Sequence, residues 1–149
     1  MKFKFWFTIA CIFFFGYTAS YAQNANLKKV SDDNWIEYLV PKFMNDVTNY
    51  KTNMSPHSVR YDYVSGDKRV KISILVNNST NPRKEFQYNL EKSYNGILSR
   101  KDLMVEYKVL KSNKYFISGY YTNGQILYQF ANTKDGFGYT YSILYDTSY

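Results

Sequence analysis

The fold is decided by residues 115–146, "YFISGYYTNGQILYQFANTKDGFGYTYSILYD". Two turn signals divide this stretch. One is the pair Asn123-Gly124, which is typical of tight hairpin turns, and the other is Gly136, whose freedom at positive φ suits a bulged hairpin loop. Between the turns, apolar residues alternate with small or polar ones. The stretch therefore predicts three antiparallel strands, at residues 115–122, 125–132 and 137–146.

The last of these strands is rich in aromatic rings, and they all fall on one face. That face carries Phe137, Tyr139, Tyr141, Ile143 and Tyr145, and the other carries Gly138, Thr140, Ser142, Leu144 and Asp146. Such alternation is typical of an antiparallel sheet with one face against a core. We therefore expect the rings to be mostly core, with their hydroxyl groups at its rim. A binding platform is the alternative.

Three more strands follow from the same period-2 alternation upstream. Residues 58–65 and 69–77 alternate on either side of the turn pair Gly66-Asp67, which predicts a hairpin. Residues 103–110, "LMVEYKVL", predict a further strand that a short turn connects to residues 115–122.

One segment has the spacing of a helix. Phe86, Leu90, Tyr94 and Ile97 recur at intervals of three or four, so an amphipathic helix is expected over residues 83–100. The residues just before this segment suit a helix start, because Asn81 can cap it and Pro82 suits the first helical position.

The N-terminal part of the chain is ambiguous. Trp35, Leu39 and Phe43 are four residues apart, as on one helix face, but Pro41 opposes a continuous helix. Residues 32–50 are therefore expected to be either a short helix or an extended segment. Residues 23–31 are expected to be a flexible lead and residues 51–57 a loop.

Together these elements predict an α+β fold. We expect an antiparallel sheet of about six strands in the order β-β-α-β-β-β-β, one main helix packed on a face, and the short N-terminal helix or extended segment. Residues 32–149 have the length of a typical domain, so a single α+β domain is expected there.

The first 22 residues have the features of a signal peptide. Lys2 and Lys4 form a basic start, the apolar run "FWFTIACIFFFG" follows, and the small residues Ser20 and Ala22 suit signal peptidase. The run is too short for a membrane-spanning helix, which needs about 20 apolar residues. We expect cleavage after Ala22 and export to the periplasm or the extracellular space, with no membrane span left; an uncleaved N-terminal anchor is the alternative.

The charge of the chain argues against nucleic acid as a partner. Without Lys2 and Lys4, the 19 basic residues fall to 17 against 12 acidic ones, a net charge of +5. The short basic runs are interrupted, and no known nucleic-acid-binding module is present. We expect a protein or a cell-envelope component as the partner. The oligomeric state is left open.

The chain lacks the sequence patterns of the common catalytic and metal sites. Cys11 is the only cysteine and lies in the expected signal peptide, and the only histidine, His57, lies in an expected loop. Zinc sites need three or four ligands, usually His or Cys. No G-x-S-x-G, P-loop or G-x-G-x-x-G motif occurs. We therefore predict no catalytic residue, no cofactor and no metal, and expect that the protein is not an enzyme.

Three segments of the chain resemble the Mog1/PsbP-like group of small α+β domains. They are the hairpin end "KISILVNNS" (71–79), the helix "PRKEFQYNLEKSYNGIL" (82–98) and the stretch "YFISGYYTNGQILYQFANTKDGFGYTYSI" (115–143). The resemblance covers about residues 35–146. It implies an exported accessory or interaction module and supplies no catalytic residue. A cystatin-like or NTF2-like helix-on-sheet domain is the alternative.

The alternation leaves some apolar residues on the face that the helix is not expected to cover. Those residues are Phe116, Tyr120, Leu127 and Leu144, which we identify as candidate partner-binding residues. Residues 32–47 could instead pack over this face through Trp35 and Phe43.

Two functions follow from these features. The first is an exported, non-catalytic binding or accessory module. The alternative is a small periplasmic enzyme or ligand carrier with a tyrosine-lined pocket between helix and sheet.

Overall fold

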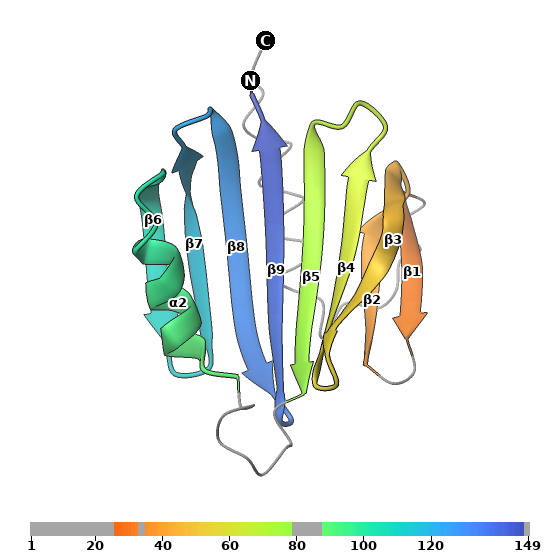
Figure 1. Cartoon of the computed structure of the whole chain (residues 1–149), viewed down its shortest axis with the longest axis horizontal. Helices are drawn as coiled ribbons and strands as arrows, with labels where there is room; N and C mark the ends of the chain where they lie inside the picture. The colour runs from red at the N-terminus through yellow and green to blue at the C-terminus, as the bar shows by residue number, and fades with distance from the viewer. Residues whose placement is uncertain (1–25, 33–34, 79–87, 148–149) are drawn as a thin grey trace.

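The computed structural model describes residues 26–32, 35–78 and 88–147. Within them, seven strands form one antiparallel sheet in the order β3-β4-β5-β9-β8-β7-β6, and two more strands form a separate pair (Figure 1). The strands are β1 (Leu27–Asp32), β2 (Ile36–Pro41), β3 (Met44–Ser55), β4 (Ser58–Ser65), β5 (Val70–Asn78), β6 (Leu103–Lys111), β7 (Lys114–Tyr121), β8 (Gln125–Lys134) and β9 (Phe137–Asp146). The helix is α2 (Leu90–Leu98).

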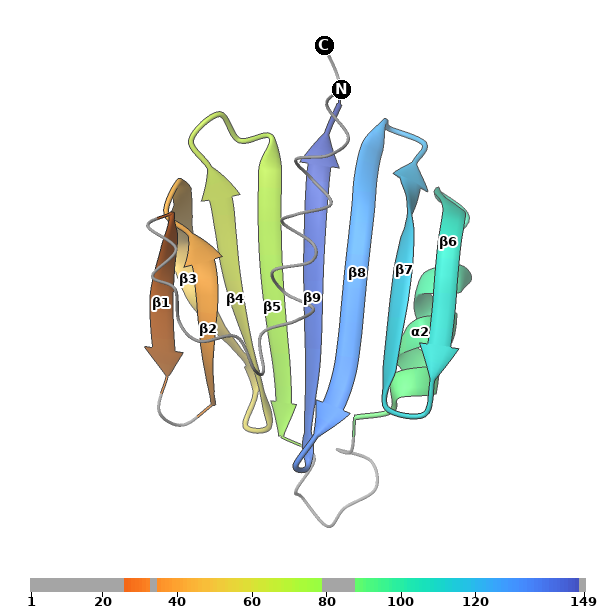
Figure 2. The same ribbon diagram turned by 180° about the vertical axis from the view of Figure 1, so that it is seen from behind.

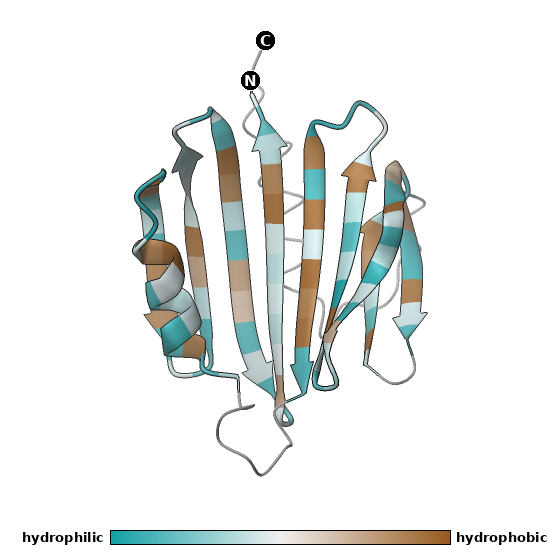
Figure 3. Ribbon diagram, viewed as in Figure 1, coloured by the Kyte–Doolittle hydropathy of each residue, from teal (hydrophilic) through white to brown (hydrophobic). Residues whose placement is uncertain are grey.

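The two-stranded sheet and the helix lie on opposite sides of the large sheet. Strands β1 and β2 lie beside β3 and β4, whereas α2 lies on the other side, near β6 and β7 (Figures 1 and 2). The alternation of apolar and polar residues that predicted the strands is visible along β5 (Figure 3). The α+β class and the antiparallel sheet are therefore confirmed.

Cross-strand pairing shows which residues share a face of the large sheet. One row consists of Tyr63, Ile72, Ile143, Tyr128, Ser118 and Tyr107. We call the face that carries this row the tyrosine face. The opposite face carries Tyr115, Ile117, Leu127 and Ala131, and we call it the helix face because Leu90 of α2 packs with Tyr115, Ile117 and Ala131.

The first core lies on the tyrosine face, between β4–β5 and the β1–β2 pair. Tyr61 and Tyr63 are each 1% exposed and pack with Tyr38 and Val40 of β2. The buried hydroxyl groups find partners, as burial requires. Tyr38 and Tyr63 share a 2.6 Å hydrogen bond, and Tyr61 donates to Asp32 at 2.7 Å. Tyrosines of β2 and β4 therefore form the first core. The rings of β9 that were expected to be mostly core are half-buried and pack against it; they are Phe137, Tyr139, Tyr141 and Tyr145.

The second core lies on the helix face. Leu90 of α2 meets Tyr115, Ile117 and Ala131, with Tyr94 and Ile97 packed beside them. The hydroxyl of Tyr115 accepts a 2.7 Å hydrogen bond from Gln129 and shares another, at 2.9 Å, with Ser93 of α2. Burial nevertheless dominates and raises the pKa of Tyr115 to about 12.

The N-terminal part of the chain differs from the predicted order of elements. Residues 27–32 form β1, where a flexible lead was expected, and residues 36–41 and 44–55 form β2 and β3, so the extended alternative holds. The expected loop at 51–57 lies mostly in β3. The large sheet therefore has seven strands, rather than about six, and a two-stranded sheet accompanies it. The alternation signal missed β3 because most of its side chains are polar and exposed.

The helix is shorter than the predicted range of 83–100. Tyr88 and Asn89 are not helical, and Asn89 caps α2 by accepting a 2.8 Å hydrogen bond from the backbone N–H of Lys92. The expected cap Asn81, Pro82 and Phe86 lie outside the described residues. Helix α2 contacts β6, β7 and β8. The helix was expected to pack on a face of the sheet, and its contacts are confined to the strands at the β6 end.

Candidate functional site

The tyrosine face changes character from one end of the sheet to the other. At β4 and β5 its residues are buried beneath the β1–β2 pair, with Tyr61 and Ile74 almost fully covered. At β6, β7 and β8 its apolar residues are all half-buried or exposed. They are Met104, Tyr107, Val109, Phe116, Tyr120, Ile126, Tyr128 and Phe130, and we call them the aromatic surface.

The β6 edge of the aromatic surface is the most exposed part. Met104 is 55% exposed, Tyr107 58% and Tyr120 37%. The Tyr107 and Phe116 rings have centroids 5.9 Å apart and tilt against each other at 51°. Large apolar side chains that lie together on a surface usually mark a site of interaction.

An irregularity in β6 brings Met104 and Tyr107 to the same face. Val105 pairs with Gly119, and the next pair is Tyr107 with Ser118, so Glu106 is an extra residue in the ladder. Such a bulge reverses the alternation, because residues three apart then point to the same side. The bulge also requires Gly119, since a Cβ there would lie 2.2 Å from the backbone oxygen of Met104.

Charged groups of both signs accompany the aromatic surface. Burial, and then the negative charge of Glu106, raise the pKa of Tyr128. Lys111 and Lys114 are directly paired across the β6–β7 turn, and both are exposed. The eight residues of the aromatic surface are themselves uncharged, but the carboxylate of Glu106 acts on Tyr128 among them, and Lys111 and Lys114 lie at one end.

The four residues predicted to bind a partner do not form one strip. Phe116 and Tyr120 lie on the aromatic surface, with Tyr120 opposite Ile126. Leu127 pairs with Gly119 and Leu144, so Leu127 and Leu144 lie on the helix face. Leu127 is 2% exposed and belongs to the interior.

The length of the β7–β8 turn explains the difference. The predicted two-residue turn would have put Tyr121 opposite Ile126. The structure instead leaves three residues, Thr122, Asn123 and Gly124, between the strands, with Gly124 at φ 85°. One extra residue exchanges the two faces of the following strand.

Sequence reasoning missed six residues of the aromatic surface. They are Met104, Tyr107 and Val109 of β6 and Ile126, Tyr128 and Phe130 of β8, the last three because of the β7–β8 turn. Strict alternation separates Met104 from Tyr107, so the bulge hides their shared face. The exposed apolar residues of "LMVEYKVL" are the signal that could have suggested an accessible strand.

The predicted alternative, packing of residues 32–47 over the tyrosine face, holds at the other end of the sheet. Tyr38 and Val40 are buried against β4 and β5, and Trp35 packs beside them. Phe43 is 55% exposed and is not part of that core.

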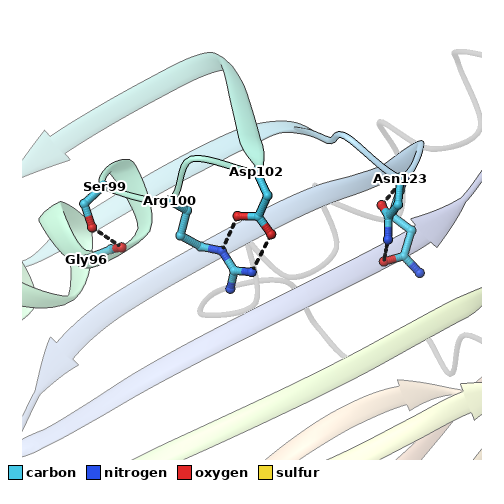
Figure 4. A network of polar contacts seen from close by, with 6 residues as sticks. Gly96, Ser99, Arg100, Asp102 and Asn123 are labelled. Atoms are coloured by element: carbon cyan, nitrogen blue, oxygen red, sulfur yellow. Dashed lines mark hydrogen bonds and ion pairs between the residues drawn. The ribbon is translucent and has the colours of Figure 1, made fainter.

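Polar contacts fix the turns at the end of the sheet where α2 joins β6 (Figure 4). Arg100 donates two hydrogen bonds to the carboxylate of Asp102, at 3.1 and 2.9 Å, and lies 4.9 Å from the centre of the Tyr121 ring. The backbone oxygen of Asp102 accepts from the N–H of Thr122 at 2.9 Å, which joins this turn to the β7–β8 turn. The arrangement is structural, since its groups pair with one another.

The structure shows a shallow depression on the outer side of α2. Its volume is about 550 Å³ and it is lined by polar residues, among them Asn89, Lys92 and Asn95. This depression does not lie between the helix and the sheet. There the rings of Tyr94 and Tyr115 pack together, with their centroids 5.6 Å apart.

The described residues contain neither a metal-binding cluster nor a membrane-spanning helix. No group of three or more His, Cys, Asp or Glu side chains that could hold a metal ion occurs in residues 26–32, 35–78 and 88–147. Among the helices of that same part of the chain, none has the length and apolar character needed to cross a membrane.

Comparison with solved structures establishes the fold. No family model and no curated protein matches the chain. The solution structure of cyanobacterial PsbP from Synechocystis sp. PCC 6803 is 13% identical, covers 87% of this chain and 86% of that chain, and has a TM-score of 0.54. A crystal structure of a Pseudomonas aeruginosa protein of unknown function is 8% identical over 82% of this chain and 84% of that chain, with a TM-score of 0.37. The first likeness confirms the predicted PsbP-like fold.

Proposed function

We propose that the protein is an exported, non-catalytic accessory module that binds a protein partner through the aromatic surface. The observation that carries this proposal is the exposure of Met104, Tyr107 and Tyr120 on one face of β6 and β7. Burying these side chains in a complex would remove apolar area from water, which is the main driving force of association.

The residue types favour a protein as the partner. Interfaces are enriched in Tyr, Phe and Met, and Tyr is among the side chains that contribute most to binding energy. The surface is part of a sheet, so its backbone is held by ladders on both sides of β7 and β8. A rigid surface of this kind loses little conformational freedom on binding.

Export is the second part of the proposal. It rests on residues 1–22, whose basic start, apolar run and small residues have the order of a signal peptide. Mass spectrometry of the protein from its host tests it: a mature chain that starts at Gln23 is expected, and a mass that retains residues 1–22 would contradict cleavage.

A tyrosine-lined pocket between helix and sheet receives less support. Leu90, Tyr94 and Tyr115 are in contact there, and the depression on α2 lies on its outer side. At the place where the enzyme or ligand-carrier alternative expects a pocket, the described side chains of α2 and β7 are therefore in contact with one another.

Capture of the partner from the native host tests the binding role. The Met104→Ser, Tyr107→Ser double variant removes two exposed apolar side chains from the surface, and loss of a stoichiometric partner is expected. The matched control is Leu110→Ser, because Leu110 is also exposed on β6, at 40%, but pairs with Tyr115 on the helix face. Equal capture by wild type and the double variant would refute the proposal.

A further inference from the structure

We infer that the partner docks on the aromatic surface with a segment that is both apolar and acidic, and that its carboxylates lie against Lys111 and Lys114. The inference rests on the proposed function, because it specifies the chemistry of the partner at the same surface. The observations that carry it are the positions and the missing counter-charges of the two lysines.

The two lysines lie side by side on the tyrosine face. Lys111 follows Val109 by two residues and Lys114 precedes Phe116 by two, so each continues the aromatic surface along its own strand. They are also directly opposite each other at the β6–β7 turn. Like charges in directly opposed positions of a sheet repel each other and destabilise the pair.

Nothing in the described part of the chain neutralises this pair. The ion pairs found in residues 26–32, 35–78 and 88–147 involve other cations, and neither Lys111 nor Lys114 takes part in one. Lys134, on the neighbouring β8, lies at the same end of the sheet and on the same face, and it is 3.9 Å from Asp135. This end of the surface is therefore basic.

The turn between these lysines is joined to strand β8. The backbone N–H of Thr133 in β8 donates a 2.9 Å hydrogen bond to the oxygen of Asn113 in the β6–β7 turn. The basic end therefore has a fixed position relative to the aromatic rows beside it. A carboxylate placed there would relieve the repulsion between the lysines and gain two attractions.

Charge complementarity at the rim of an apolar surface mainly sets the choice of partner and the rate of association. An acidic residue at one end of a docking segment would orient that segment, and its apolar side chains would then lie over Val109, Phe116 and Tyr107. A basic segment would meet repulsion at the same end.

Peptide selection against the exported protein tests the inference. The probe is a displayed library of random peptides of about 12 residues, long enough to cross β6, β7 and β8. Four forms of the protein are compared: wild type, Lys111→Glu with Lys114→Glu, Met104→Ser with Tyr107→Ser, and the charge-matched control Lys92→Glu with Lys101→Glu. Lys92 and Lys101 are exposed and lie on α2 and in the following turn.

Wild type is expected to select peptides that combine acidic with apolar residues. Their affinity should fall about tenfold in the Lys111/Lys114 variant, because two attractions become repulsions, and should stay unchanged in the charge-matched control. The Met104/Tyr107 variant should lose the same peptides.

The other outcomes separate the two proposals. Peptides that need Met104 and Tyr107 but show no acidic enrichment, or that bind equally well after charge reversal, would overturn the inference and leave the proposed function standing. Peptides that bind wild type, the Lys111/Lys114 variant and the Met104/Tyr107 variant equally well would count against both proposals. Failure to select any peptide would overturn docking of a short segment, while capture of the partner would still test the proposed function.

Discussion

At the scale of single residues, two glycines have opposite roles. A Cβ at Gly119 would lie 2.2 Å from the backbone oxygen of Met104, whereas a Cβ at Gly96 would meet nothing within 4 Å. Gly119 is therefore required by the close approach of β6 at its bulge. Gly96 lies in the exposed part of a helix, where glycine is less favourable than alanine.

We predict that Gly119→Ala lowers the free energy of unfolding by about 3 kcal/mol, because strand β6 must move away. Gly96→Ala should raise it by about 0.5–1 kcal/mol. Denaturant unfolding of the two variants measures both values. A Gly119 variant as stable as wild type would show that β6 does not approach β7 as described.

The Tyr38–Tyr63 pair is the shortest tyrosine contact of the first core, with 2.6 Å between the two hydroxyl oxygens. Tyr38→Phe or Tyr63→Phe alone should cost about 1–2 kcal/mol, because the remaining hydroxyl keeps no partner in a buried site. The double variant should cost clearly less than the sum, since neither polar group remains. A double-mutant cycle by denaturant unfolding gives the coupling, and strict additivity would refute the hydrogen bond.

Alkaline pH should destabilise the fold through its buried tyrosines. Burial raises the pKa of Tyr115 from 10.0 to about 12, and burial also raises the pKa of Tyr38 and Tyr61. The unfolded chain then loses these protons first, so stability is complete below about pH 10 and falls as the pH rises further, by up to about 1.4 kcal/mol per pH unit for each group. Unfolding free energies measured on both sides of pH 10 test this, and Tyr115→Phe should make the fall less steep.

At the scale of elements, local alternation was informative wherever one face of a strand is apolar. The strands at 58–65, 69–77, 103–110, 115–122, 125–132 and 137–146 were all expected close to their observed bounds. Strand β3 could not be expected in this way, because "MNDVTNYKTNMS" is an edge strand with mostly polar, exposed side chains. Its pairing with β4 holds it, and pairing between distant segments leaves no local pattern.

The faces of the strands were harder to predict than the strands themselves. A third turn residue between β7 and β8 and the extra residue Glu106 in β6 each reverse the alternation. Two of the four predicted residues, Phe116 and Tyr120, therefore lie on the aromatic surface, whereas Leu127 and Leu144 were assigned to the wrong face. Partner binding by these residues stays a prediction. Thr140 was likewise expected to face away from the core, but it is 7% exposed and its hydroxyl shares a 3.0 Å hydrogen bond with Tyr88.

The register of β8 gives a direct test of this correction. Leu127 is 2% exposed on the helix face, and its neighbour Ile126 is half-buried on the aromatic surface. We predict that Leu127→Ala costs about 3 kcal/mol of stability and Ile126→Ala about 1 kcal/mol, because only the first leaves a cavity in a packed interior. Denaturant unfolding measures the stability loss of each variant. A larger loss for Ile126→Ala than for Leu127→Ala would contradict this register and favour the two-residue turn.

At the scale of the whole molecule, the fold is built from two cores that lie on opposite faces of the large sheet. The first lies on the tyrosine face between β4–β5 and the β1–β2 pair, and the second lies on the helix face between α2 and β7–β8. Because the two covers lie at opposite ends of opposite faces (Figures 1 and 2), the aromatic surface is the part of the tyrosine face that the β1–β2 pair does not reach. The accessible apolar residues are thus a consequence of the diagonal arrangement.

This arrangement predicts how damage to the two cores combines. Val40→Ala should destabilise the first core and Leu90→Ala the second, each by about 1–3 kcal/mol, since both remove buried apolar atoms. The two sites share no partner, so the double variant should show the sum of the two effects within about 0.5 kcal/mol.

The sheet should still unfold in one step, because β5, β9 and β8 connect the two cores through continuous ladders. Calorimetry and denaturant unfolding of the double variant measure both points. A coupling above about 1 kcal/mol would show that the cores communicate across the sheet, and two separate transitions would show that the β1–β2 end and the α2 end unfold independently.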